Sequence, residues 1–218
     1  QIKSSLNEFL ACVPPEGRFF ASADPMVFLL EDQSKEGESV RKHFQEIGLN
    51  PEQSRQYFNT GVLYFNRSAW AVIAEKARTI IRSQNTMSRF PDQDILNIVG
   101  IERALPMSLS WNFPVFLHNA RLESTIQPKI VHYMSQPKPW DGIFQPWQAS
   151  DYAPYPAFVA AYPEFSGLWK RSSLSRKLRY FAQQHYKRFC ETRKWGHGAV
   201  HALVLDYEAK CRNDAKQV

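Results

Sequence analysis

The sequence predicts a mixed α/β fold followed by a helical C-terminal part, and three observations favour it. The 218 residues are 44% hydrophobic, which is enough to form a sizeable core. The 14 prolines, 9 glycines and 14% aromatic residues indicate many loops. Strand-like and helix-like segments alternate over residues 1–150, whereas residues 151–218 indicate a Pro- and aromatic-rich linker and a basic helical extension, so we expect one globular unit or two tightly joined ones.

The first elements follow from local residue types. Ser4 or Ser5 is expected to cap a short helix that ends near residue 10. A strand is expected over 17–22, and a loop with a helix over 31–48. The β-branched and aromatic residues of 57–65 predict a buried strand.

Helices dominate the remaining elements. Ser68 is expected to cap a helix in which five apolar side chains recur at helical spacing: Trp70, Ile73, Ala77, Ile80 and Ile81. The acids of 92–94 favour the start of another helix, because its N-terminus is positive. Short strands are expected over 103–105 and 129–133, an irregular segment after Trp140, and closing helices over 174–190 and 199–211.

The net charge of +6 is concentrated near the C-terminus. Residues 170–194 contain nine Lys or Arg residues, with Glu191 as the single acid. If residues 168–195 are helical, one side carries Leu174, Leu178, Phe181 and Phe189, a pattern typical of a helix lying in a membrane surface. Each cation near an anionic leaflet would add about 1 kcal/mol. The alternative is a solvated helix packed on the rest of the protein.

Other features bear on localisation. No apolar stretch is long enough to cross a bilayer, and nothing near Gln1 resembles a signal peptide. The three cysteines are far apart, which is not a disulfide framework and favours a reducing compartment. We therefore expect a cytoplasmic protein, peripheral on the inner membrane face if the basic helix binds lipid.

Four polar clusters lie where a predicted strand ends or a helix begins, the usual ligand-binding position in α/β sheets. They are Ser22-Ala-Asp24, Phe58-Asn59-Thr60-Gly61, Asp92-Gln93-Asp94 and the segment from His132 to Trp140. The first three have structural alternatives. Asp24 suits a turn before Pro25, and Asn59 suits backbone bonding in an irregular strand. Asp92 and Asp94 suit helix capping.

The fourth cluster suggests specific chemistry. His132 ends an apolar strand and Lys138 follows six residues later, before the rigid Pro139-Trp140. A neutral imidazole suits a metal ion and an ammonium group suits a phosphate. Both would suit a metal-bound nucleotide diphosphate. A core histidine with a surface lysine is the alternative.

Together, the clusters resemble glycosyltransferase family 8, the retaining GT-A enzymes that include bacterial lipopolysaccharide galactosyl- and glucosyltransferases. YFNTGVLYFNRSAW is similar to the family's F-N-[SA]-G-V strand motif, and FPDQDILN to its D-Q-D-x-L-N element. LSWNF resembles its W-N segment, and KIVHYMSQPKPW its I-x-H-[FY]-x-G-x-x-K-P-W segment. Four motifs in order, over about residues 5–141, form a much stronger signal than any one of them.

The resemblance implies the role of each residue. His132 would bind Mn²⁺ (or Mg²⁺) bridging the phosphates of a UDP-sugar, and Ser135 and Lys138 would bind the diphosphate. Gln93 would face the reacting sugar carbon, with Asp92 beside it. The donor or acceptor sugar would be bound by Asp24, Asn59, Thr60, Gly61 and Asp92. Sugar transfer develops positive charge on the sugar and negative charge on the diphosphate, which oxygen atoms and a cation would stabilise.

The sequence departs from the family pattern in two places. Ser135 stands where the family usually has Gly. The family's metal-binding Asp-x-Asp pair is absent ahead of Ser4, so by resemblance the chain begins just after that pair. We therefore expect a GT-A fold without its N-terminal nucleotide-binding strands, and a polypeptide that does not turn over by itself.

The resemblance thus predicts a metal-dependent, retaining hexosyltransferase that moves a hexose from a UDP-sugar to a saccharide or glycolipid, for example lipopolysaccharide. One alternative is a catalytically inactive transferase-like domain that binds sugars or partners. Another is a nucleic-acid-binding protein, since the C-terminal cations and aromatic residues suit phosphates and bases. The four clusters have no role in that last alternative, so we expect no nucleic-acid partner.

Overall fold

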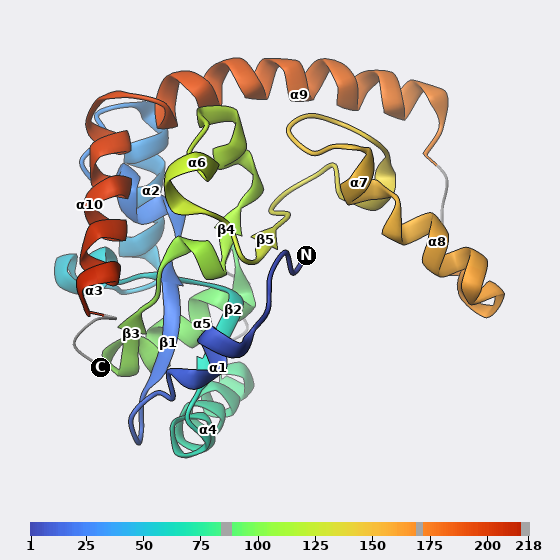
Figure 1. Cartoon of the computed structure of the whole chain (residues 1–218). Coiled ribbons are helices and arrows are strands. Elements are labelled where there is room, and N and C mark those ends of the chain that lie inside the picture. The colour runs from blue at the N-terminus through green and yellow to red at the C-terminus, as the bar shows by residue number, and fades with distance from the viewer. Residues whose placement is uncertain (84–88, 169–171, 215–218) are drawn as a thin grey trace.

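The computed structural model describes residues 1–83, 89–168 and 172–214 and confirms the α/β class (Figure 1). Its main sheet has the strand order β2 (Phe58–Phe65), β1 (Phe19–Ala23) and β3 (Ala104–Pro106). Strand β1 runs antiparallel to β2 and parallel to β3. A second, smaller sheet pairs β4 (Phe113–Pro114) with β5 (Val131–His132) in parallel.

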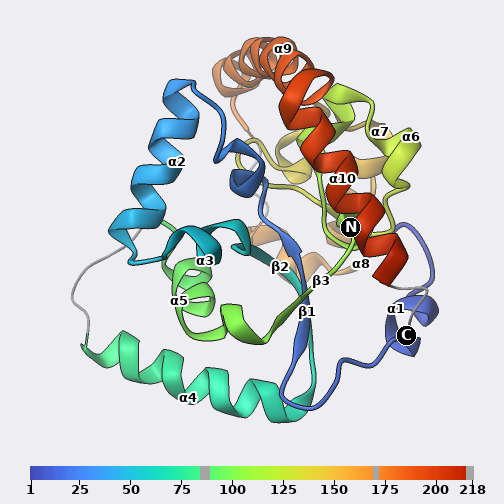
Figure 2. The same ribbon diagram turned by 90° about the vertical axis from the view of Figure 1, so that its left-hand side faces the viewer.

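Helices surround these sheets, and Figure 2 shows α4 and α5 on the opposite side of the main sheet from α9 and α10. The α-helices are α1 (Asn7–Ala11), α2 (Lys35–Glu46), α3 (Pro51–Arg55), α4 (Arg67–Ser83), α5 (Pro91–Gly100), α6 (Glu123–Ile126), α7 (Ala149–Tyr152), α8 (Pro154–Ala161), α9 (Leu174–Trp195) and α10 (Gly198–Asp214). The 3-10 helices are η1 (Pro25–Leu29), η2 (Ile101–Arg103), η3 (Leu109–Trp111), η4 (Val115–Ala120), η5 (Pro139–Asp141) and η6 (Pro163–Leu168).

The largest apolar cluster joins the main sheet to the C-terminal helices. Phe44 of α2 and Tyr57, just before β2, pack in this cluster with Trp195 of α9 and Val204 of α10. A buried polar contact reinforces this packing. Glu208 of α10 accepts hydrogen bonds from the Leu109 backbone amide (2.6 Å) and the Ser108 hydroxyl (2.7 Å). The start of η3 is therefore anchored to α10.

Three local predictions are wrong. The N-cap residue of α1 is Leu6 rather than Ser4 or Ser5, and its side chain makes no capping hydrogen bond. Ser68 does not cap α4, because the Asn66 carboxamide oxygen accepts from the Ser68 amide and Ser68 lies inside the helix. Of the apolar residues that recur along this helix, as predicted, Ile73 and Ala77 are buried, whereas Trp70 and Ile81 are exposed. The segment after Trp140 is not irregular throughout, because it forms α7 and α8.

The basic segment forms a longer helix than expected, and its apolar side faces solvent. Helix α9 runs on to Trp195, and it contacts the protein through the buried side chains of Tyr180, Gln184 and Trp195. The four apolar residues predicted to share one side are exposed by more than half: Leu174, Leu178, Phe181 and Phe189. Residues 169–171 of this segment lie outside the described residues.

Candidate functional site

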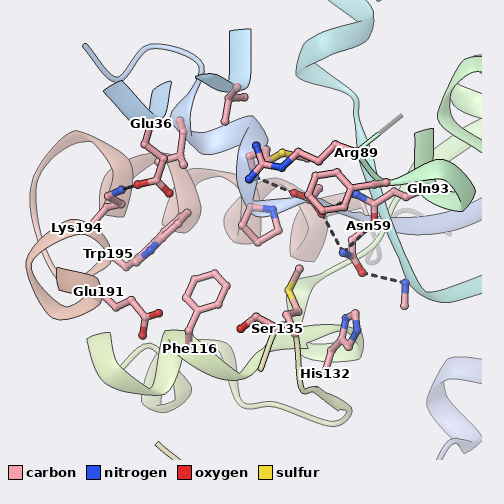
Figure 3. A pocket seen from close by; sticks show the side chains of 18 of the residues that line it. Glu36, Asn59, Arg89, Gln93, Phe116, His132, Ser135, Glu191, Lys194 and Trp195 are labelled. Atoms are coloured by element: carbon pink, nitrogen blue, oxygen red, sulfur yellow. Dashed lines mark hydrogen bonds and ion pairs between the residues drawn. The ribbon is translucent and has the colours of Figure 1, made fainter. Parts of the chain in front are cut away.

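The four polar clusters meet at one cavity of about 680 Å³ (Figure 3). It lies between the end of β1, the start of β2, the N-terminus of α5 and the loop after β5. All the predicted site residues line it: Asp24, Asn59, Thr60, Gly61, Asp92, Gln93, His132, Ser135 and Lys138. Segments more than 100 residues apart in sequence are thus brought together, as expected from their positions at the ends of strands and the starts of helices.

Asp24 serves as a helix cap and as part of the cavity wall. One carboxylate oxygen accepts from the Met26 amide (3.0 Å) and caps η1. The other oxygen accepts from Asn59 Nδ2 (2.9 Å) and Gln93 Nε2 (3.0 Å). Burial raises the pKa of Asp24, and these hydrogen bonds oppose that rise. The capping interpretation and the site interpretation therefore describe different oxygens of one side chain.

The amides of Asn59 and Gln93 hold each other in fixed orientations. Gln93 Oε1 accepts from Asn59 Nδ2 and from the Thr60 backbone amide, both at 3.2 Å. Asn59 Oδ1 accepts from the Gly61 amide and from Asn112 Nδ2, both at 2.9 Å. The Gln93 oxygen, which was predicted to face the reacting sugar carbon, is thus engaged with β2. Any contact with a sugar uses an amide that is already positioned.

Asp92 and Asp94 lie in different environments, because residues two apart on a helix point in nearly opposite directions. Asp92 is exposed at the cavity rim, whereas Asp94 is 1% exposed and does not line the cavity. Asp94 Oδ1 accepts from the Tyr57 hydroxyl (2.5 Å) and lies 3.1 Å from His43 Nε2. Burial, followed by the hydrogen bond to Asp94, raises the pKa of Tyr57 above its usual value, so this hydroxyl stays protonated.

Tyr57, His43 and Asn97 were not predicted as site residues. The Tyr57 hydroxyl accepts from Gln93 Nε2 (3.2 Å), which links Gln93 to buried Asp94. Asn97 bonds both the amide and the carbonyl of Phe58 at 2.8 Å, so α5 is fixed to the start of β2. The spacing of Gln93 and Asn97, one helical turn apart, was a usable signal for Asn97. No local signal pointed to His43.

His132 lies directly against Gly61. A Cβ atom added to Gly61 would fall 2.3 Å from His132 Cε1, so only glycine leaves room for the ring. His132 Nδ1 is buried and has no hydrogen-bond partner among the described residues. Burial and then the Lys138 charge lower the pKa of His132 to about 4, which keeps the ring neutral at neutral pH. A neutral ring with an unpaired nitrogen suits a metal or hydrogen-bonding ligand.

The donor set for a metal ion is partly present. His132 lines the cavity, and its Nδ1 has no hydrogen-bond partner among the described residues, so the ring suits the role of one metal ligand. Within 1–83, 89–168 and 172–214, no group of three or more His, Cys, Asp or Glu side chains is arranged to hold a metal ion. These residues therefore fit a single protein ligand rather than a complete metal centre.

Helices α2 and α9 form the far wall of the cavity, which the sequence did not reveal. Figure 3 shows the Lys194–Glu36 ion pair between the two helices, with Trp195 beside Phe116. Glu191 also lines the cavity and accepts from Asn119 Nδ2 (2.6 Å). Burial raises the pKa of Glu191, and the Asn119 bond opposes this rise. Aromatic faces beside carboxylates and an ammonium group suit a polyhydroxylated ligand.

Three bacterial transferases are similar to this chain in sequence. Lipopolysaccharide 1,2-glucosyltransferase of Escherichia coli (strain K12) is 30% identical over 102 residues, which are 42% of this chain and 30% of that protein. Lipopolysaccharide glucosyltransferase WaaO of the same strain is 30% identical over 149 residues, or 62% of this chain and 42% of that protein. Lipopolysaccharide 1,3-galactosyltransferase of Salmonella typhimurium is 29% identical over 149 residues, or 60% and 42%. The matched segments thus span less than half the length of these relatives.

A solved structure shares the fold. The apo structure of WbbM, a bifunctional glycosyltransferase, is similar with a TM-score of 0.50 and 21% identity, over 64% of this chain and 28% of that chain. This similarity supports the expected GT-A class. The model of the family described as Glycosyl transferase family 8 matches residues 5–143. Since that match covers more than half of the sequence, the chain belongs to glycosyltransferase family 8.

Proposed function

We propose that this chain carries the sugar- and diphosphate-binding part of a transferase that moves a hexose from a UDP-sugar to a saccharide or glycolipid, with lipopolysaccharide as the favoured acceptor class. One observation carries the proposal. Residues from four separate segments of a family 8 chain line a single cavity. The relatives named as lipopolysaccharide glucosyl- and galactosyltransferases support the acceptor class and leave both hexoses open.

The residues that line the cavity would have different roles, according to the chemistry of their side chains. Asp24, Asn59 and Gln93 form a rigid hydrogen-bonding wall, which suits sugar hydroxyls. His132 would hold a divalent cation, and Lys138 would contact the diphosphate. The cation, when bound, would offset the negative charge of the departing diphosphate. Preorganised groups of this kind stabilise developing charge without having to reorient during the reaction.

Membrane attachment through α9 is part of the proposal. Its exposed apolar side, with Phe181 58% and Phe189 67% exposed, lies on a helix that also carries Lys177, Arg188 and Arg193. Apolar residues flanked by cations suit an anionic membrane surface. Among the described helices, none has the length and apolar character needed to span a bilayer. The proposed place of action is the cytoplasmic face of the membrane.

Donor binding and transfer are tested separately. The side-chain amide NMR signals of Asn59 and Gln93 should shift when UDP-glucose or UDP-galactose is added with Mg²⁺. Transfer of labelled hexose to lipopolysaccharide with a shortened sugar chain is measured with Mn²⁺. Shifts without transfer would agree with our prediction that this polypeptide is inactive by itself. Neither shifts nor transfer with either donor would overturn the proposal.

Replacing the proposed metal ligand gives a sharper test. His132→Ala should abolish the Mn²⁺-dependent part of donor binding, and of transfer where transfer occurs, because no other imidazole lines this cavity among the described residues. Circular dichroism should stay unchanged. His185→Ala, at an exposed position on α9, is the matched control. Equal Mn²⁺ dependence in the two variants would remove His132 from the metal site.

A further inference from the structure

The cavity carries two lysines that form no ion pair with a described residue, although the carboxylates of Asp141 and Glu191 lie near enough to interact with their charges. Lys194 is paired with Glu36, but Lys138 and Lys187 also line the cavity, and neither forms an ion pair with a carboxylate of the described residues. Burial lowers the pKa of Lys138, and the nearby Asp141 carboxylate offsets this shift only in part. Ammonium groups in such a position favour an anionic ligand.

Lys187 reaches the cavity from α9, outside the segment that matches the family model. It follows buried Gln184 by three residues and precedes Glu191 by four, so these residues share the inner face of the helix. Its ammonium group donates to Ser135 Oγ (3.3 Å) and to the Gln136 carbonyl (3.1 Å). It is therefore bound to the loop between His132 and Lys138.

Both lysines bind that loop through neutral oxygens. Lys138 donates to the Tyr133 carbonyl, while Lys187 uses the Ser135 hydroxyl and the Gln136 carbonyl. Carbonyl and hydroxyl oxygens hold an ammonium group in place without cancelling its charge. Two positive charges are thus fixed along residues 133–138, at the edge of the cavity.

We propose that Lys187 is a second cationic contact for the diphosphate of the donor, acting beside Lys138, and that α9 is therefore part of the donor site. The inference rests on the proposed function, which assigns this loop to a diphosphate. It adds a residue that lies outside every motif of the family resemblance. It also gives Ser135 a role, because its hydroxyl is one of the oxygens that hold the Lys187 ammonium group over the loop.

The test measures binding of pyrophosphate and of UDP, each with Mg²⁺, by isothermal titration calorimetry. Lys187→Gln should weaken binding about tenfold, as expected for loss of one charge-assisted contact. It should also make binding less sensitive to salt. Lys187→Arg, which keeps the charge, should stay within about threefold of the wild type. Lys138→Gln is the reference for a loop cation, and Lys76→Gln, exposed on α4, is the charge-matched control.

The outcomes separate the two proposals. If Lys138→Gln weakens binding but Lys187→Gln behaves like Lys76→Gln, Lys187 has no such role and the proposed donor site stands. If Lys76→Gln weakens binding as much as Lys187→Gln, the effect is general charge and the inference is overturned. If the wild-type chain binds neither probe, the proposed donor site fails and the inference fails with it. Urea unfolding of each variant checks that a loss of binding is not a loss of fold.

Discussion

Gly61 packs so closely against His132 at the cavity wall that a side chain there would displace the His132 ring. Because the added Cβ would meet the ring at 2.3 Å, we expect Gly61→Ala to displace the imidazole and to lower the free energy of unfolding by about 1–3 kcal/mol. The His132 ring signals in NMR spectra should shift, and metal binding should weaken. Gly100→Ala is the control, since its nearest contact would be an ordinary 3.4 Å. Unchanged His132 signals in Gly61→Ala would contradict this.

Tyr57 links the cavity to the buried Asp94. Tyr57→Phe removes the hydroxyl that donates to Asp94 and accepts from Gln93, so it should cost about 1–3 kcal/mol of unfolding free energy. The Gln93 side-chain amide should also become more mobile, which NMR relaxation would detect. Tyr64→Phe is the control, because that hydroxyl makes one longer bond, to the Leu10 carbonyl (3.3 Å). Equal losses in the two variants would argue against a special role for Tyr57.

The motifs identified residues that share one cavity, whereas the role of each residue stays a prediction. Asp24, Asn59, Gln93 and His132 each lie on the cavity, although their contacts could not be derived from the sequence. Tyr57 was treated only as part of a strand. Its function depends on Asp94 being 37 residues away in sequence and 2.5 Å away in space. Contacts of that kind follow from tertiary packing, which local patterns do not encode.

Helix α10 is anchored by a carboxyl group that is buried at 2% exposure. Burial raises the pKa of Glu208, whereas its bonds to Ser108 and Leu109 oppose the rise. The folded protein therefore keeps the Glu208 proton to a higher pH than the unfolded chain does. Ionisation of Glu208 therefore lowers the stability of the fold as pH rises. The loss begins near the pKa of Glu208 in the unfolded chain and is complete once pH exceeds its pKa in the folded protein.

Glu208→Gln should remove that part of the pH dependence. Relative to the wild type, its free energy of unfolding should increase as pH rises above about 4.5, the ordinary pKa of this carboxyl group, because only the wild type must ionise it. Urea unfolding at several pH values gives the difference directly, and other acids such as Asp24 cancel in it. Glu52→Gln, an exposed acid on α3, is the control. A pH-independent difference would show that Glu208 does not titrate differently on folding.

Periodicity predicted that helices exist better than it predicted which side is buried. The apolar positions of α4 and α9 recur at helical spacing, and both helices form. Trp70 and Ile81 of α4 are nevertheless exposed, and so are Phe181 and Phe189, on the side of α9 that was expected to face a membrane surface. The buried side of α9 is instead marked by Tyr180 and Gln184, which contact the rest of the protein. A sequence pattern gives the apolar face of a helix but not the surface that covers it.

At the scale of the whole molecule, the cavity has one wall that the family motifs predicted and one that they did not. Helices α2 and α9 meet through Glu36 and Lys194, which are 158 residues apart. The contact depends on how α9 crosses the rest of the fold (Figure 1). No motif describes that crossing, because the family match ends at residue 143 and α9 begins at Leu174. The same crossing leaves the other side of α9 uncovered.

The uncovered side of α9 leads to a prediction for the whole molecule. The wild-type chain should sediment with anionic phospholipid vesicles and should dissociate as salt is added, because cations flank the exposed apolar residues. Phe181→Glu with Phe189→Glu should weaken binding at least about tenfold, since two large apolar groups can no longer enter the lipid. Val72→Glu with Ile81→Glu makes the same change in charge on exposed positions of α4 and should have little effect.

If both double variants weaken binding equally, net charge alone drives attachment. If neither does, α9 does not bind the membrane through this side.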